Sequence, residues 1–212
     1  MADNQLSTSG NGLIERVKGV ILKPAPTWDA INAESASVKS LMLGVAAPLA
    51  AIGPVAALIG GQLFGYGAMG INVKPDLGAA LQIAIVTYVL ALAGVFVLSL
   101  IIDALAPTFG GTRNKVQALK VAVYSSVPGW VAGALGILPA LTILIVIAGI
   151  YGLYVMYLGL PKLMKSPPDK AVGYTAAAVV SAIVIYMIVG YLASQLMPAP
   201  AMNVDVSGMR VS

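Results

Sequence analysis

Five long apolar blocks follow one another from residue 41 onward, separated by short gaps. They cover residues 41–64, 77–105, 116–137, 140–160 and 171–196. A hydrocarbon core about 30 Å thick is crossed by about 20 helical residues, so each block is long enough to span a membrane. Because unpaired backbone groups in lipid cost several kcal/mol each, a spanning block must be helical. The pattern predicts an all-α membrane protein with a bundle of five transmembrane helices.

The composition points to a bilayer as the solvent and argues against an enzyme. Hydrophobic residues make up 59% of the chain and charged residues 9%, whereas soluble domains contain about 25% charged residues. The absence of Cys and His excludes disulfides, thiol nucleophiles, Cys/His metal sites and the usual general base. We therefore expect no catalytic residues, no cofactor and no metal. The net charge of +4 is too small and too scattered to suggest nucleic acid as a partner.

Basic residues lie in alternate gaps between the blocks. Only Lys74 and Arg210 belong to one side, and the other ten of the twelve basic residues belong to the other. These ten are Arg16, Lys18, Lys23, Lys39, Arg113, Lys115, Lys120, Lys162, Lys165 and Lys170. Because Lys and Arg are enriched in cytoplasmic loops, we predict a cytoplasmic N-terminus and an extracytoplasmic C-terminus.

The third block, 116–137, is the least secure of the five. It contains Lys120 near its start and Pro128 inside it. Its connection to the fourth block is a few apolar residues without charge. Residues 116–160 therefore form either two full spans or a re-entrant hairpin. In both cases the two ends lie on one side, so the remaining topology is unchanged.

The segment before the first span contains a short helical pattern. Apolar residues recur at helical spacing from Leu13 to Ile21, and Pro24 should end this helix. Thr27 is a candidate cap for a second short turn. We predict an amphipathic helix on the cytoplasmic face with Trp28 as an interfacial anchor; the alternative is a helix packed against the protein's own loops. The predicted regions are a cytoplasmic segment (1–39), a membrane domain (40–197) and a disordered extracytoplasmic tail (198–212).

The second cytoplasmic gap and the end of the span before it contain the first candidate site. Asp103 is the only acid inside or at the edge of a span. It either pairs with Arg113 or Lys115, or takes part in binding an ion or substrate. Gly110 and Gly111 permit a tight turn with positive φ, and Thr112 or Asn114 is a candidate cap of the next helix. These glycines and the two cations form either a simple turn or a site for a phosphate or lipid headgroup.

Three further features lie inside the spans. Tyr151, Tyr154 and Tyr157 form a slanted stripe on one helix, which either packs against other helices or lines a polar cavity. Pro128 should kink its helix, and the preceding Ser125 and Ser126 hydroxyls are candidates to bond the freed carbonyls. Close helix packing is suggested by two GxxxG patterns, at residues 61–65 and 129–133.

Several runs of residues resemble the YIP domain family. They are Asp103 with Phe109-Gly110-Gly111, residues 115–119, Tyr124-Ser125-Ser126-Val127-Pro128, and the more specific run 154–171 with Pro161 and Lys165. The resemblance implies five helices with a cytoplasmic N-terminus. Eukaryotic members associate with Rab-type GTPases and with one another. Lys23-Pro24, Trp28 and Ile31 are similar to the opening of bacterial members, so we expect a bacterial inner-membrane protein and no Rab-type partner.

Two functions are compatible with this sequence. The first is a non-enzymatic membrane protein that acts in membrane organisation or by binding other membrane proteins, as a homo-oligomer or with different partners. The second is a small channel or transporter for ions, small solutes or lipids, using Pro128, the tyrosines and Asp103. In both, the lipid bilayer is the surrounding partner.

Overall fold

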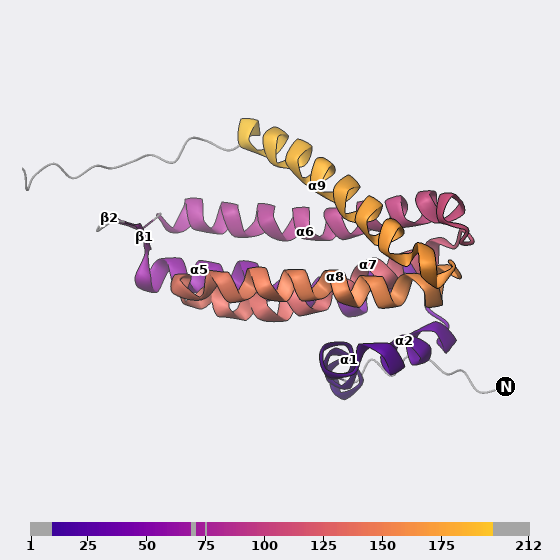
Figure 1. Cartoon of the computed structure of the whole chain (residues 1–212). Helices are drawn as coiled ribbons and strands as arrows, with labels where there is room; N and C mark the ends of the chain where they lie inside the picture. The colour runs from indigo at the N-terminus through magenta and orange to yellow at the C-terminus, as the bar shows by residue number, and fades with distance from the viewer. Residues whose placement is uncertain (1–9, 69–70, 75, 197–212) are drawn as a thin grey trace, which may run out of the picture.

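The long helices lie side by side in one bundle, and two short N-terminal helices lie against it near one end (Figure 1). The computed structural model describes residues 10–68, 71–74 and 76–196. The N-terminal pair is α1 (Gly10–Leu22) and α2 (Pro24–Ala33). The predicted disordered tail, 198–212, lies outside the described residues.

The first predicted span is a continuous helical stretch with one irregular turn. It consists of α3 (Val38–Leu41), the π-helical turn η1 (Met42–Ala46), α4 (Ala47–Ala50) and α5 (Ile52–Phe64). Ser37 and Ser40 cap its start reciprocally. A short antiparallel hairpin follows, in which β1 (Tyr66–Ala68) pairs with β2 (Ile71–Val73).

The remaining helices continue the predicted order. They are α6 (Leu77–Leu105), the 3₁₀ turn η2 (Ala106–Phe109), α7 (Lys115–Ala132), η3 (Gly133–Ile137), η4 (Pro139–Leu141), α8 (Thr142–Met164), η5 (Pro168–Lys170) and α9 (Ala171–Leu196). Asp76 accepts hydrogen bonds from two backbone amides at the start of α6, and Asn114 does the same at the start of α7. The predicted bounds of α6 and α9 are confirmed, and Asn114 is confirmed as a cap.

Four helical stretches of the described chain are long and apolar enough to cross a membrane: Val38–Phe64, Leu77–Phe109, Thr142–Met164 and Pro168–Ile185. They correspond to the first, second, fourth and fifth predicted blocks. The third, α7, is not among them, because Lys115, Gln117 and Lys120 lower its apolar content. The chain is therefore a membrane protein whose bundle is all-helical. A fifth membrane span, which would include α7, remains a prediction.

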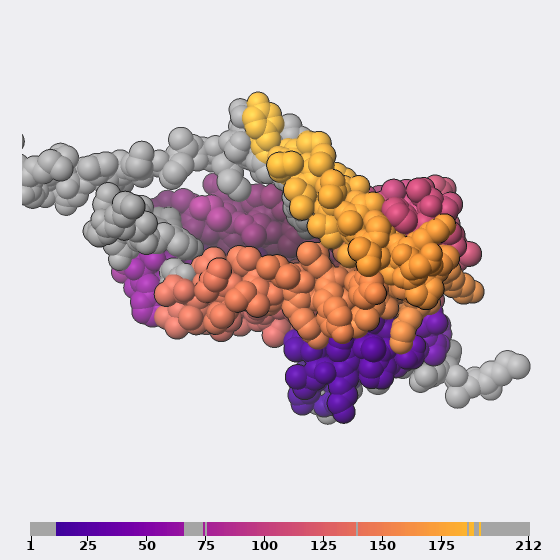
Figure 2. Space-filling model, in the orientation of Figure 1, coloured from indigo at the N-terminus to yellow at the C-terminus, as the bar shows by residue number. Residues whose placement is uncertain are grey.

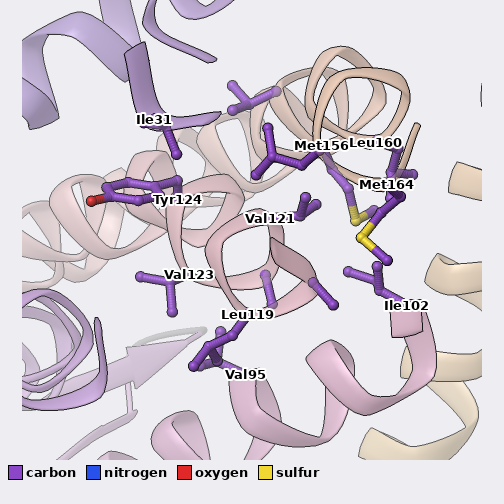
Figure 3. Packing of buried hydrophobic residues seen from close by; sticks show 14 of the residues in the cluster. Ile31, Val95, Ile102, Leu119, Val121, Val123, Tyr124, Met156, Leu160 and Met164 are labelled. Atoms are coloured by element: carbon purple, nitrogen blue, oxygen red, sulfur yellow. The ribbon is translucent and has the colours of Figure 1, made fainter. Parts of the chain in front are cut away.

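α7 lies at the centre of the bundle despite its polar residues. It contacts α6 and α8 extensively, and also α1, α3, α4 and α5. Ten of its residues between Ala118 and Pro128 are buried. Figure 3 shows Leu119, Val121 and Val123 of α7 among side chains from α2, α6 and α8. Since protein rather than lipid surrounds this part of α7, it has less need of an apolar surface.

Glycine allows the closest contacts between the helices. A Cβ atom on Gly152 of α8 would lie 2.5 Å from the carbonyl oxygen of Ser125 in α7. Gly133 similarly meets the backbone of Gly53. The GxxxG predictions are only partly right: Gly129 has no neighbour within 4 Å of a Cβ position, and Gly65 ends α5 with a φ of 70°.

Candidate functional site

The end of the bundle that holds the α6–α7 and α8–α9 loops brings together most of the predicted site residues, with α2 beside it (Figure 1). α2 begins at Pro24, so the prediction that Thr27 caps it is wrong. Proline suits the first helical position because its missing N–H needs no partner there. The Thr27 hydroxyl instead donates to the Lys23 carbonyl at 2.7 Å. This earlier start makes α2 a ten-residue helix that packs on α8.

Trp28 fixes α2 to the bundle. Its side chain is 1% exposed, and its indole N–H donates to the Val155 carbonyl at 2.9 Å. The ring meets Tyr124 edge-on and covers Gly159, where a Cβ atom would lie 2.6 Å from the indole. The prediction that Trp28 anchors the chain at the membrane interface is therefore wrong. Because Gly159 of α8 has no side chain, it leaves the space in which the Trp28 indole is buried.

Lys120 of α7 holds the C-terminal end of α2. Its side chain is buried, and Nζ donates to the carbonyls of Ile31 at 2.7 Å and Glu34 at 2.6 Å. These are carbonyls at the end of α2, where the helix has no internal partners for them. A cation is favourable at a helix C-terminus, so this contact offsets the cost of burying the ammonium group. Glu34 is also paired with Arg16 of α1.

α8 supplies two more polar contacts to the N-terminal helices. Lys162 Nζ lies 2.7 Å from both carboxylate oxygens of Asp29 and 2.8 Å from the Ala25 carbonyl. Tyr151 donates its hydroxyl to the Ile21 carbonyl at 2.8 Å. Figure 2 shows the indigo N-terminal helices seated directly against α8. The N-terminal segment is therefore part of the folded unit.

α1 divides its apolar side chains between protein and surroundings. Val20 is buried, and Leu13, Val17 and Ile21 pack against the core. Ile14 and Leu22 remain 53% and 73% exposed. Most of the apolar side chains of α1 therefore pack on the protein, which was one of the two predicted alternatives.

Asp103 does not form the ion pair predicted for it. The residue is 8% exposed, and its Oδ1 atom is buried with no hydrogen-bond partner in the described structure. Arg113 and Lys115 are both exposed, and neither forms an ion pair with a described residue. Tyr174, close by, instead bonds the Ile102 carbonyl. A buried carboxyl without a cation is unusual in a membrane helix.

The double glycine joins two loops. Gly110 has a φ of 73°, which confirms the predicted turn with positive φ. Gly111 packs so closely that a Cβ atom would lie 2.7 Å from the Met164 carbonyl. The same carbonyl accepts a bond from the Thr112 amide at 2.8 Å. The α6–α7 loop is therefore fixed to the end of α8, next to Lys165, which adopts a left-handed φ of 54°.

The tyrosine stripe separates into two parts. Tyr151 is half-buried and bonds α1, whereas Tyr154 and Tyr157 are 50% and 36% exposed. The rings of Tyr151 and Tyr154 are 5.7 Å apart. The three residues therefore neither pack together against one helix nor line either of the two cavities described below.

The two intrahelical prolines differ in their surroundings. Pro128 is buried within α7, and Pro161 is half-buried within α8. The hydroxyls of Ser125 and Ser126 both donate to the Ala122 carbonyl, at 3.2 and 2.8 Å. The carbonyl that Pro128 frees is that of Tyr124, four residues before it. The predicted role of the serines at that carbonyl is therefore wrong.

Sequence reasoning missed Lys120, Lys162 and Gly159 as positions that organise this end. Lys162 was counted as a cytoplasmic cation, and Lys120 as a cytoplasmic cation that makes the third block less secure. A lysine inside an apolar block is itself a signal of a buried partner. Gly159 carries no comparable signal, because the helix that covers it is remote in sequence.

Two cavities lie between the helices, and apolar side chains dominate both. The α5–α6 cavity, of about 220 Å³, is lined by Gly53, Pro54, Ala57, Leu58, Gly61, Ala80, Ile83, Ala84 and Thr87. The α6–α9 cavity, of about 40 Å³, is lined by Leu90, Ala93, Gly94, Val97, Leu98, Ile101, Ala182 and Ile185. Among the described residues, no cluster of three or more acids could hold a metal ion.

Comparison with known proteins places this architecture in a family. No curated protein and no solved structure matches the chain significantly. The family model of the Yip1 domain matches residues 18–191, which include the docked α2, the joined loops and every helix of the bundle. This protein is therefore a membrane protein that belongs to the Yip1 domain family.

Proposed function

We propose that this protein is a non-enzymatic membrane factor that acts in membrane organisation by binding a second copy of itself or another membrane protein. The α5–α6 cavity is the observation that carries the proposal. Gly53, Ala57 and Gly61 follow one another at four-residue spacing on α5, so they share one face. Ala80 and Ala84 of α6 face the same space. Small residues in this arrangement allow a further helix to approach closely.

The polar side chains support a structural rather than a catalytic use. Trp28, Lys120, Tyr151 and Lys162 all bond backbone carbonyls of another helix or its end. Groups committed in this way hold the N-terminal segment in place. They leave few polar atoms free to act on a substrate.

We further propose five spans in the inner membrane of a bacterium, with α7 and η3 forming the third. At 1.5 Å per residue the 18 residues of α7 extend about 27 Å, and the 3₁₀ turn of η3 adds about 10 Å. Together they are long enough to cross a hydrocarbon core of about 30 Å. The excess of basic residues in alternate gaps supports a cytoplasmic N-terminus in this proposal.

Single cysteines test both parts of this proposal, because the native chain has none. In intact cells we expect an impermeant maleimide to label Lys74→Cys and to label Lys115→Cys only after permeabilisation. For the interface, Ala57→Cys and Ala84→Cys should give cross-linked products, identified by mass spectrometry as a homodimer or a membrane-protein adduct. Val180→Cys on α9 is the control. Absence of any cross-linked product from both Ala57→Cys and Ala84→Cys would overturn the protein-binding role.

Transport is the second candidate, and the buried Asp103 carboxyl favours it. The Oδ1 atom of Asp103 is buried without a hydrogen-bond partner in the described structure, and an acid at the end of a span is a candidate ion or proton site. Flux of ions, small solutes or labelled lipids into proteoliposomes tests this function. Flux that falls in Asp103→Asn would support it, and equal flux in both proteins would remove Asp103 from any such role.

A further inference from the structure

Four cations at one end of the bundle form what we call the basic rim: Arg113, Lys115, Lys165 and Lys170. All four are exposed. The ion pairs within the described chain use Arg16, Lys18 and Lys162 instead. The two loops that carry the rim contain one carboxylate, Asp169. The rim therefore has a surplus of positive charge that the described acids do not neutralise.

The two loops of the rim form a single surface. The Thr112 amide bonds the Met164 carbonyl at 2.8 Å, which joins the α6–α7 loop to the end of α8. Pro167 packs against Gly110, and Lys170 Nζ reaches within 3.6 Å of where a Cβ atom of Gly110 would lie. Figure 1 shows both loops at the same end of the bundle, where α9 begins.

The α6–α9 cavity begins near the end of α6 that leads into the basic rim. The Tyr174 hydroxyl of α9 donates to the Ile102 carbonyl, and its ring stacks on Phe109 with a centroid distance of 5.0 Å. These contacts hold the C-terminal end of α6 against the N-terminal end of α9. The cavity begins at the next residue, Ile101, and extends along α6 to Leu90. Leu90 and Ile101 are eleven positions apart, which corresponds to about 16 Å along a helix, close to one leaflet of a hydrocarbon core. Figure 2 shows α9 diverging from the bundle on this side.

We propose that the basic rim and the α6–α9 cavity together bind one anionic phospholipid. The phosphate group contacts the rim cations, and part of one acyl chain lies in the cavity. The cavity of about 40 Å³ has room for only a few methylene groups, so it seats one segment of an acyl chain while the rest of the chain lies along the apolar surface of α6 and α9. A helix, with a diameter of about 10 Å including its side chains, is too wide for it. Clustered Lys and Arg residues beside a membrane attract anionic headgroups. The charge thus selects the headgroup, and the apolar walls fix the chain.

Binding of phosphatidylglycerol and phosphatidylcholine to the purified full-length protein, measured by native mass spectrometry, tests the headgroup contact. We expect the wild type to bind phosphatidylglycerol more tightly. Replacing all four rim cations by Gln should remove this preference, with a loss of about fivefold in affinity for each charge. The exposed positions should leave thermal stability unchanged, and Lys74→Gln at the far end is the matched control. Equal binding of the two lipids by the wild type, or a preference that survives in the rim variant, would overturn the proposal.

Filling the cavity tests the acyl-chain contact separately. Ala182→Leu and Gly94→Leu each place a larger side chain in the α6–α9 cavity, so both should weaken binding of both lipids. Ala84→Leu, in the α5–α6 cavity, should not. Thermal melting identifies which of the two cavity variants is folded, and a folded variant with wild-type lipid affinity would exclude the acyl chain from this cavity. Loss of cross-links at Ala84→Cys would leave this lipid site intact, so failures of the two proposals are distinguishable.

Discussion

α7 and α9 relate composition to burial in opposite ways. α7 contains Lys120 and Pro128, yet it is the most enclosed helix of the bundle. α9 has no charged residue from Ala171 to Leu196, yet Val180 and Met187 are 60% and 61% exposed. In a bilayer, lipid tails are as apolar as the side chains, so apolar residues are needed where a helix meets lipid. A helix enclosed by protein can carry polar groups, provided that each finds a partner.

The largest effect should come from breaking the contact between α7 and α8. Gly152→Leu places a side chain where the Ser125 carbonyl now lies, and neither backbone can move aside cheaply. We expect loss of the folded bundle, seen as aggregation or absence of a thermal transition in detergent. Gly149→Leu is the matched control on the same helix, because no neighbour lies within 4 Å of its Cβ position. Similar behaviour of the two variants would mean that α7 is not held by α8 in this way.

Removing the indole that covers Tyr124 and Gly159 should have the next largest effect. Trp28→Ala deletes a fully buried aromatic side chain, which costs about 3–5 kcal/mol in protein cores. We expect the free energy of unfolding, followed by circular dichroism, to fall accordingly and the segment before α3 to become sensitive to protease. Trp28→Phe keeps most of the packing and loses the bond to Val155, so it should cost about 1 kcal/mol. A protected N-terminus in Trp28→Ala would show that α2 does not depend on this contact.

Lys120→Met tests whether the buried cation of α7 stabilises the fold through α2. Hydrogen bonds to charged groups contribute about 1.5–3 kcal/mol, and two carbonyls would lose their donor. Methionine recovers part of the packing, so we expect a net loss of about 2–4 kcal/mol. Lys165→Met, at an exposed position, should change unfolding by less than about 0.5 kcal/mol. Equal stability of the two variants would contradict a structural role for Lys120.

The smallest expected effect comes from a matched pair of valines, one in α7 and one in α9. Val121 of α7 is fully buried, whereas Val180 of α9 is 60% exposed. Val121→Ala leaves a cavity and should cost about 1–2 kcal/mol, whereas Val180→Ala exchanges contacts with lipid and should cost less than about 0.5 kcal/mol. Thermal unfolding of both variants in one detergent measures the difference. Equal losses would contradict the exposure of Val180 to lipid.

Prediction from the sequence succeeded where the signal was local. Block length and the residues that flank each block located α6 and α9, and Asn114, one of the two predicted caps, was a candidate because of its residue type. It failed where a side chain meets a distant segment. Trp28 was assigned to the membrane interface, because tryptophan prefers that position when nothing else binds it. For Asp103 two alternatives were predicted, a cation partner or a role in binding an ion or substrate, and the first is wrong because the nearest basic residues along the chain do not pair with it.

The sequence alone determined that the chain is a helical membrane protein, and it predicted five spanning stretches, four of which are helices long and apolar enough to cross a bilayer. These properties depend on the length and polarity of continuous segments, because a bilayer accepts only helices that are long and apolar enough to cross it. Only the tertiary structure decided that the most polar of the long helices lies at the centre, that Lys120 holds the end of α2, and that Gly159 receives Trp28. Each of these requires two segments about 90 or more residues apart to meet with suitable shape and hydrogen bonds. Periodicity along one segment carries no information about such a meeting.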